Sequence, residues 1–378
     1  MANIPRAYSL VNNPIASLLA YEIAQIPSQP KVPQVVLLLN DQKKLSRFLE
    51  NDSKLTIQKG NDSDYHHTQF MASHLPPVYS SGQVASIANA IFSGPHTKGL
   101  VQSIRKYCAC FHGFSNILLV DPPAGAIEHL YRKVWRTVHS RPNLFVGVTT
   151  QRERRIATSV DEFRIDVKQG TLSLSISPVP KDFKHYTFNT TFDDELKRRH
   201  DVDLFKLLDA ASNNESGVVP LDIRYHSYGE LLLMRLERLI VESCTEPLAA
   251  IYGCRYIGEL LFSSQADDMI RKMIKEQMRI LWLTHPFLAN IQNSGIALDC
   301  ERLYSVIKKE LNSGIDRKSV MRLKVDQLEA TNVNELTGYF VRLAAYRKID
   351  CKWNEAVTNL VKGKVALTRH RALSHKYL

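Results

Sequence analysis

Glycine is scarce in this chain: 16 of its 378 residues are glycine, about 4% against a usual ~7%. Dinucleotide-binding loops need glycine, because a side chain keeps the backbone away from the diphosphate. The scarcity therefore argues against a working dinucleotide site. Long apolar runs are also missing. No stretch approaches the ~18 residues that cross a bilayer, so we predict no transmembrane segment.

Cysteines are few and scattered. The six in the chain do not suggest a disulfide framework, and they fit a reducing compartment. Cys108, Cys110 and His112 form a Cys-x-Cys-x-His group, but no second ligand pair follows at the spacing of a zinc site. We therefore expect no metal site.

Acidic residues are absent before Glu22 and after Glu355. The segment before Glu22 has a single arginine, Arg6, and is predicted to form the first strand, so a cleaved presequence is not expected. The chain as a whole carries a net charge of +11. Such a charge favours anionic partners, namely nucleic acid, a ribosome or an anionic membrane surface.

Strand and helix patterns alternate over residues 1–226. Asn13 is a good N-cap and Pro14 suits a first helical turn, so a helix should begin there, and a second helix is expected from Gln42 to Leu49. Strands are predicted at Arg6–Val11, Val35–Leu39, Ile117–Val120 and Leu144–Val148, with a hairpin of Glu162–Val167 and Thr171–Ile176. This order predicts an α/β, Rossmann-like, doubly wound domain. Its polar stretch 181–217 is expected to be an insertion with a solvated helix and loop.

Residues 227–378 have helical periodicity almost throughout, which predicts an all-α C-terminal domain. A long helix from Glu230 should be interrupted by Pro247. Further helices are expected at Ile270–Leu288 and Glu335–Tyr346, followed by a basic tail.

Three stretches resemble the ketopantoate reductase family. They are residues 117–128 (ILLVDPPAGAIE), 237–248 (ERLIVESCTEPL) and 331–338 (TNVNELTG). The resemblance implies a dinucleotide-binding domain that precedes a helical domain. It also implies positions for a catalytic lysine, for asparagines and for a substrate-holding glutamate.

A second resemblance runs from end to end, to the yeast mitochondrial cytochrome b translational activators. It rests on residues 28–33 (SQPKVP), 35–44 (VVLLLNDQKK), 242–248 (ESCTEPL), 347–348 (RK), 351–354 (CKWN) and 377–378 (YL). This resemblance implies a mitochondrial protein on the matrix side, peripheral to the inner membrane. Its partners would be the mitochondrial ribosome, the cytochrome b mRNA leader, contacted directly or indirectly, and other cytochrome b translation factors.

The expected phosphate loop is degenerate. Its three glycine-type positions read Val11, Asn13 and Ala16. A β-branched residue resists the positive φ of a tight turn, Asn13 would use an amide that an anion needs, and Pro14 has no N–H. We therefore expect no cofactor. The alternative is a nonstandard pocket in which Lys43 and Lys44 hold a 2′-phosphate.

The family's catalytic positions are degenerate as well. Its lysine reads Arg238, which stays charged and is a poor general acid. The asparagines read Glu242, Glu246 and, in the loop after residue 120, Pro122, and the glutamate reads Asn332. The alternative for the helical positions is an exposed ion-pair row, since they are spaced by four residues. The pattern predicts a non-catalytic protein on a dehydrogenase scaffold.

Basic residues are unevenly distributed. Residues 301–378 have 16 Lys and Arg against 8 Asp and Glu, which gives +8 of the net +11. The candidate RNA or ribosome contacts are Lys362, Lys364, Arg369, Arg371 and Lys376; Arg132, Lys133, Arg136 and, beside them, Arg141; and Arg152, Arg154 and Arg155. Each set could also be an ordinary solvated face.

Three functions remain open on the sequence. The first is a non-catalytic translational activator of cytochrome b. The others are an NADPH-dependent reductase with an atypical site, and a membrane-associated scaffold that does not touch RNA.

Overall fold

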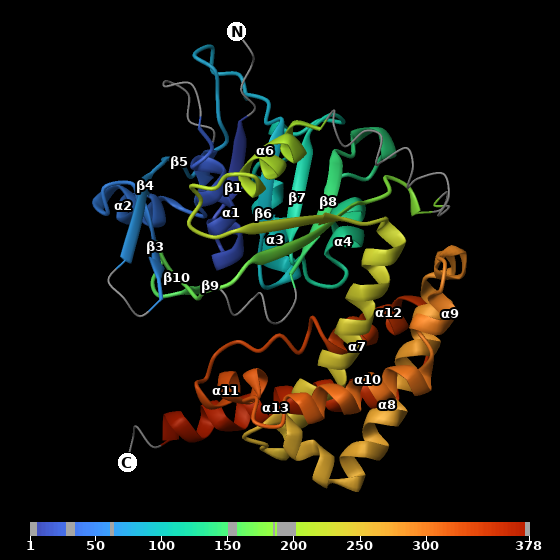
Figure 1. Cartoon of the computed structure of the whole chain (residues 1–378). Coiled ribbons are helices and arrows are strands. Elements are labelled where there is room, and N and C mark those ends of the chain that lie inside the picture. The colour runs from blue at the N-terminus through green and yellow to red at the C-terminus, as the bar shows by residue number, and fades with distance from the viewer. Residues whose placement is uncertain are drawn as a thin grey trace. The chain divides into compact units, whose positions relative to one another are not determined.

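The computed structural model describes residues 6–27, 35–60, 64–149, 157–183, 186 and 202–374. The chain divides into two compact units, Met1–Leu231 and Leu232–Leu378. The first unit is α/β and the second is helical (Figure 1). This confirms the predicted order of an α/β domain followed by an all-α domain.

An eight-stranded sheet forms the centre of the first unit. Its order is β12-β11-β8-β7-β6-β1-β2-β5. The strands are β1 (Ala7–Leu10), β2 (Val35–Leu38), β5 (Met71–Ser73), β6 (Asn89–Ser93), β7 (Asn116–Val120), β8 (Asn143–Val148), β11 (Leu172–Pro178) and β12 (Leu221–Tyr225). All neighbouring pairs are parallel except β11 with β8. Strand β2 is buried throughout, as expected for a strand with both faces covered.

Helices cover both faces of this sheet. Strand β2 lies on one side of β1 and β6 lies on the other, so the chain crosses the sheet in two directions. Because each crossover is right-handed, the connecting helices lie on opposite faces. Helix α1 (Pro14–Ala24) packs against α6 (Asp203–Ser212), and α3 (Thr97–Lys106) packs against α4 (Ala126–Lys133) (Figure 1). Within the stretch 181–217, α6 buries Leu204, Phe205 and Leu208 in the core.

A second sheet of four strands has the order β4-β3-β10-β9. Its strands are β3 (Lys54–Lys59), β4 (Asp64–Gln69), β9 (Ala157–Ser159) and β10 (Arg164–Val167). The predicted hairpin is therefore wrong: β10 pairs with β3 and β9, whereas β11 belongs to the large sheet. Both strands were found, but a period-two pattern does not specify the partner of a strand.

Shorter elements complete the first unit. They are α2 (Gln42–Glu50), η1 (Cys108–Cys110) and η2 (Val138–Ser140). Phe48 of α2 packs edge to face on Phe163, with 5.0 Å between ring centroids. This contact ties α2 to the four-stranded sheet.

The second unit is a set of packed helices. They are α7 (Tyr228–Tyr252, which begins in the first unit), η6 (Ile257–Phe262), α8 (Ser264–Thr284), η7 (Pro286–Asn290), α9 (Ser294–Ala297), α10 (Cys300–Ser313), α11 (Val320–Asp326), α12 (Thr337–Arg347) and α13 (Lys352–Ser374). Side-chain oxygens of Ser263, Asp299 and Ser319 accept backbone N–H groups at the starts of α8, α10 and α11.

Helix α7 continues through Pro247, so the predicted interruption is wrong. An internal proline removes one hydrogen bond and costs about 3 kcal/mol. Residues on both sides of it, including Cys244, Leu248 and Ala249, are buried. Their packing offsets the local cost, which periodicity alone does not reveal.

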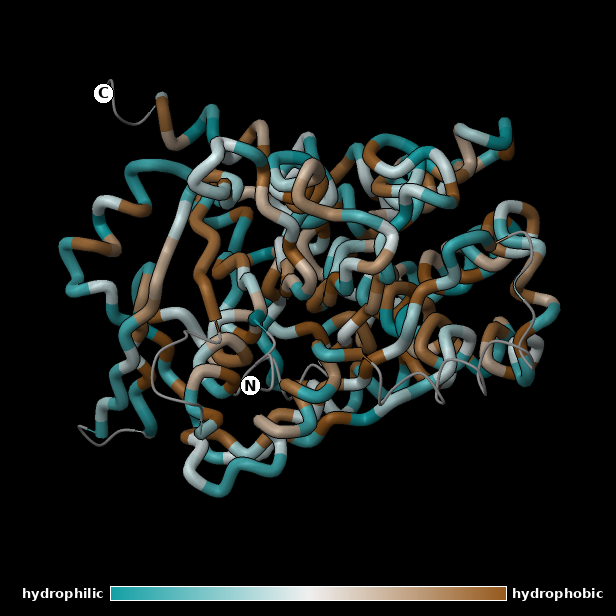
Figure 2. Tube along the Cα trace, turned by 90° about the horizontal axis from the view of Figure 1, so that it is seen from above, coloured by the Kyte–Doolittle hydropathy of each residue, from teal (hydrophilic) through white to brown (hydrophobic). Residues whose placement is uncertain are grey.

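Among the described residues, no helix combines the length and apolarity that a bilayer crossing requires. The colouring in Figure 2 shows the reason, since hydrophilic and hydrophobic residues alternate along the helices.

Candidate functional site

A pocket of about 840 Å³ lies in the first unit, where β1, β2 and β6 end. Its walls come from the β1–α1 loop, Asn40 after β2, the loop Gly94–His96 after β6, and one side of α3. Strand order reverses between β1 and β6. Open α/β sheets bind ligands at such switch points. The pocket therefore occupies the position at which this fold binds a dinucleotide.

The β1–α1 loop is built as a helix cap. Asn13 is the N-cap of α1, and its Oδ1 accepts the Ile15 N–H at 2.7 Å. Pro14 takes the first helical position and has no N–H to donate. Residues 11–16 are all described, and none of them has a positive φ. Val11 and Ala16 are buried.

Side chains tie this loop to its surroundings. The Lys44 ammonium donates to the Val11 carbonyl at 2.9 Å. Asn12 and Asn40 exchange amide hydrogen bonds of 3.2 and 2.8 Å, and the Lys106 ammonium donates to the Asn40 carbonyl at 3.0 Å. Burial lowers the pKa of Lys44. Lys44 is thus used to hold the loop.

These residues do not fit a bound diphosphate. A working loop offers free N–H groups at the start of α1. Here one donor is missing at Pro14, and another, from Ile15, is taken by Asn13. The Asn13 side chain also stands where a diphosphate would approach the backbone.

The family's catalytic lysine position, Arg238, lies on α7. Its Nε is 3.0 Å from Oε1 of Glu242, and the two side chains are 22% and 18% exposed. Glu246 does not join them. Its Oε2 accepts the Ser319 hydroxyl and the Met321 N–H, both at 3.0 Å, at the start of α11. The expected ion-pair row is therefore a half-buried pair and a separate helix cap.

The two remaining family positions lie in loops. The Asn332 carbonyl accepts the Glu335 N–H at 2.9 Å, ahead of α12. Pro122 is buried just after β7. Its neighbour Asp121 accepts the Thr149 N–H at 3.2 Å. Pro122 lies in the first unit, whereas Arg238, Glu242, Glu246 and Asn332 lie in the second.

The candidate basic residues fall into two described groups. Arg132 and Lys133 end α4, Arg136 follows it, and all three are exposed. Arg141 is half-buried, with its guanidinium 4.2 Å from the centroid of the Tyr131 ring. The other group, Lys362, Lys364, Arg369 and Arg371, lies on α13. Arg152, Arg154, Arg155 and Lys376 lie outside the described residues.

The C-terminal group is partly engaged in the fold. The Lys364 ammonium donates to the carbonyls of Ala250 and Ile251, at 2.5 and 3.2 Å, at the end of α7. Arg369 donates to the Leu328 carbonyl at 3.5 Å. Cations at a helix C-terminus stabilise it. A count of charges along the sequence could not reveal these roles.

Sequence reasoning also missed how the loops are fastened. Asn12 and Asn40 are polar residues at strand ends, which is a weak signal, and their pairing depends on the parallel register of β1 with β2. The Cys-x-Cys-x-His group has a structural role at its histidine. The ring nitrogens of His112 lie 2.7 Å from the hydroxyls of Ser86 and Ser115.

Comparison with known proteins gives a consistent result. Residues 230–365 match the family described as "Ketopantoate reductase PanE/ApbA C terminal". The whole chain is 39% identical to the whole of the cytochrome B translational activator CBS2 of Saccharomyces cerevisiae. It is 28% identical to the probable 2-dehydropantoate 2-reductase of Schizosaccharomyces pombe, over 97% of this chain and 98% of that protein.

Solved structures agree on the fold. The crystal structure of the probable 2-dehydropantoate 2-reductase panE from Bacillus subtilis superposes with a TM-score of 0.62 and 18% sequence identity. The superposition covers 95% of this chain and 99% of the bacterial chain.

Proposed function

The chain belongs to the family of the cytochrome B translational activator CBS2, and we propose that it activates the translation of cytochrome b in mitochondria without catalysing a reduction. The observation that carries this proposal is the 39% identity over the full length of both chains. It spans both units of the fold.

The partners are part of the proposal. The protein acts with the mitochondrial ribosome, the cytochrome b mRNA leader and other cytochrome b translation factors, on the matrix side and peripheral to the inner membrane. Its net charge of +11 and its exposed basic residues suit anionic partners.

The non-enzymatic part of the proposal rests on the two degenerate sites. The phosphate loop is closed by Asn13, Pro14 and Lys44. The general acid position is an arginine in an ion pair with Glu242, and an arginine does not release a proton near neutral pH.

One observation keeps a reductase as the second candidate. The pocket of about 840 Å³ persists at the switch point, and the Schizosaccharomyces pombe relative carries a reductase name. Titration of the purified protein with NADPH separates the two candidates. We expect no binding at micromolar concentration and no turnover of 2-dehydropantoate. Binding with turnover would make the protein a reductase.

Deletion of the gene tests the activator directly. Pulse labelling of mitochondrial translation products should show selective loss of cytochrome b. The Arg238→Gln/Glu242→Gln variant, which removes both charges of the ion pair, should restore its synthesis. Restoration by wild type but not by this folded variant would point to a catalytic requirement. Loss of all mitochondrial products, or of none, would refute a role specific to cytochrome b.

A further inference from the structure

Helices α3 and α4 bring two basic clusters together. Lys98 and Arg105 are exposed on α3, and Arg132, Lys133 and Arg136 are exposed on or just after α4. The helices pack side by side on one face of the sheet (Figure 1). These five cations, here called the α3–α4 surface, therefore share one side of the first unit although they are far apart in sequence.

The α3–α4 surface has little compensating charge, since Glu128 on α4 is the one exposed acid of these two described helices. Between Thr97 and Arg141 the sequence has two acids, Asp121 and Glu128, against seven Lys and Arg. Asp121 is bonded to Thr149. Within the described part of the chain, none of the five cations forms an ion pair with a carboxylate. Unpaired exposed cations attract counterions, which a polyanion can replace.

An aromatic side chain borders this surface. Phe114 is 89% exposed, the highest value among the large hydrophobic residues described. It follows Gly113, where an added Cβ would lie 3.4 Å from the His139 carbonyl of η2. The turn that carries Phe114 therefore packs against η2, the 3-10 helix after Arg136. Aromatic groups beside cations are the usual arrangement for binding single-stranded nucleic acid.

The surroundings favour RNA over a membrane. A helix that lies in a bilayer surface inserts large apolar side chains. The described residues of α3 and α4 include no exposed large hydrophobic residue. Phe114 and Val138, which is 39% exposed, are the large apolar side chains beside the cations, and two such groups are too few for the apolar face of a membrane-surface helix.

Resting on the function proposed above, we infer that the α3–α4 surface binds the phosphate backbone of single-stranded RNA and that Phe114 stacks on a base. Contacts of this kind position an RNA without reading its sequence. The C-terminal group on α13 is less available for this role, because Lys364 and Arg369 hold backbone carbonyls.

The test is RNA binding by the full chain with the substitutions Arg132→Gln, Lys133→Gln and Arg136→Gln. The probes are a fluorescent single-stranded transcript of the cytochrome b leader and an unrelated strand of equal length. At physiological salt the triple variant should bind both about tenfold more weakly. Its slope of log K against log salt should shrink by about 2, at roughly 0.7 per lost phosphate contact. Phe114→Ala should weaken binding about fivefold or more at an unchanged slope.

The matched control removes the same net charge from paired cations: Lys206→Gln, Lys272→Gln and Lys352→Gln. Each of these lysines pairs with an exposed aspartate. The control should bind RNA within about twofold of wild type, because exposed pairs contribute little to long-range attraction. Equal losses in both triple variants would reduce the effect to net charge and overturn the inference. Circular dichroism and thermal melting establish that both variants are folded.

A membrane arm uses phosphatidylcholine vesicles that contain cardiolipin. If the α3–α4 variant loses vesicle binding but keeps RNA binding, the surface is a membrane site and the inference is wrong. The deletion strain separates this failure from that of the proposed function. A variant with normal RNA binding and restored cytochrome b synthesis refutes the surface alone. A deletion without effect on cytochrome b refutes the activator itself.

Discussion

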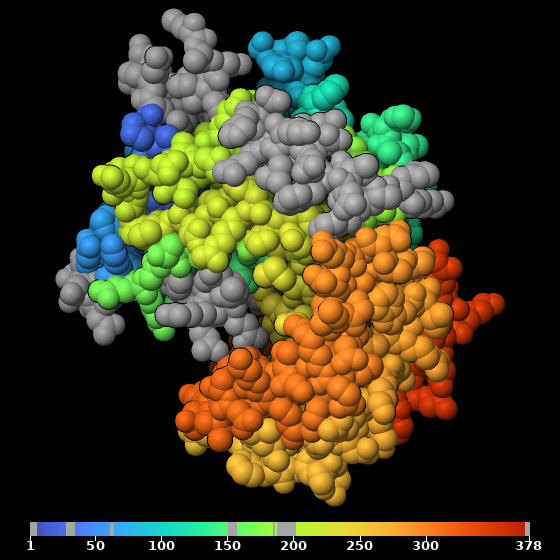
Figure 3. Space-filling view, turned by 45° about the vertical axis from the view of Figure 1, so that its right-hand side comes forward, coloured from blue at the N-terminus to red at the C-terminus, as the bar shows by residue number. Residues whose placement is uncertain are grey.

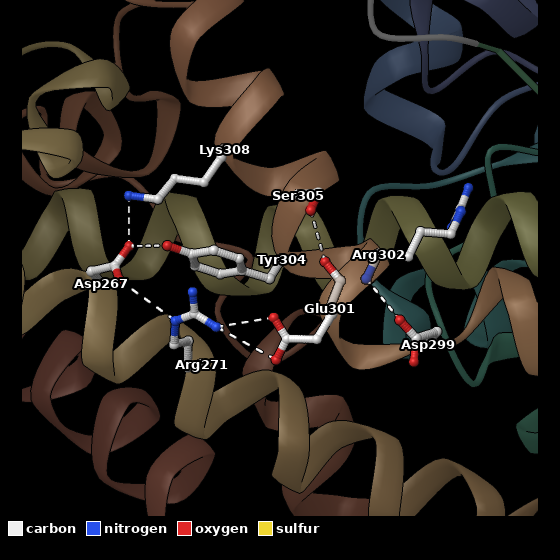
Figure 4. A network of polar contacts seen from close by, with 8 residues as sticks. All are labelled: Asp267, Arg271, Asp299, Glu301, Arg302, Tyr304, Ser305 and Lys308. Atoms are coloured by element: carbon white, nitrogen blue, oxygen red, sulfur yellow. Dashed lines mark hydrogen bonds and ion pairs between the residues drawn. The ribbon is translucent and has the colours of Figure 1, made fainter.

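Basic residues have different surroundings in the two units. The five cations of the α3–α4 surface have no described acid as an ion-pair partner. In the second unit, whose surface is drawn in gold to red in Figure 3, α8 and α10 pack against each other and several of their cations are paired. Asp267 lies 2.6 Å from the Lys308 ammonium and accepts the Tyr304 hydroxyl at 2.7 Å (Figure 4). Arg271 stacks 3.5 Å from the centroid of the Tyr304 ring.

The comparison separates charge that holds a fold from charge that is available to a partner. Residues 301–378 carry most of the net charge, yet Arg302, Lys308 and Arg317 there are each within 2.6 Å of a carboxylate oxygen. A surplus of cations along the sequence therefore does not by itself show which cations are available to a partner. A partner responds to the local field of unpaired groups.

An exposed charge needs no ion-pair partner because water solvates it, whereas a buried charge destabilises the fold. The largest predicted effect therefore concerns a buried carboxyl group. Glu22 on α1 is 1% exposed. Its Oε1 accepts the Val219 N–H at 2.9 Å, and its Oε2 has no hydrogen-bond partner among the described residues. Burial raises the pKa of Glu22 to about 7.

Folding raises the pKa of Glu22, so its protonated carboxyl group stabilises the folded protein. This contribution to the free energy of unfolding is complete below the unfolded pKa near 4.5 and is lost as pH rises through about 7. Glu22→Gln should therefore stabilise the protein at pH 8, by about 2–3 kcal/mol in the free energy of unfolding. The gain should fade towards pH 5. Urea titrations across this range measure it, and a gain that does not depend on pH would contradict the assignment.

Local rules predicted much of the fold correctly. The cap at Asn13, the turn at Pro14 and the buried strand after residue 34 follow from residue type and periodicity. The change from alternating strands and helices to helices alone separated the α/β part from the helical part. Partner choice was not predictable in this way. Strand β10 pairs with β3, which lies about a hundred residues earlier in the chain.

The candidate site likewise has features that the sequence predicts and features that it does not. The missing glycines and the arginine at position 238 are visible in the sequence. The contacts that fill the loop are not, because Lys44 reaches the Val11 carbonyl only once β1 and β2 are paired. Likewise, Lys98 and Arg105 join Arg132 through the packing of α3 on α4.

The next largest effect is expected when the paired cations of α8 and α10 lose the acid that they share. Asp267→Ala removes the shared partner of Lys308, Arg271 and Tyr304. The free energy of unfolding should fall by about 1–2 kcal/mol, above the ~0–1 of an isolated surface pair, because several groups lose one acceptor. The loss should shrink as salt rises. Asp268→Ala, which removes only the acid facing Lys272, should cost at most about 0.5 kcal/mol. Equal losses in the two variants would show that the network adds nothing beyond separate pairs.

The smallest predicted effect comes from placing an acid beside the cations of the α3–α4 surface. His129 lies one turn before Lys133 on α4, and a glutamate four residues ahead of a lysine forms a favourable helical pair of about 0.3–0.5 kcal/mol. His129→Glu should weaken RNA binding about threefold, because one phosphate contact is neutralised. Gln83→Glu makes the same change in net charge on an exposed loop of the first unit and should leave the affinity unchanged. If the two variants bind RNA equally well, the scarcity of acids on α3 and α4 has no bearing on RNA binding. If only His129→Glu weakens it, the free cations of this surface act because no neighbouring side chain neutralises them.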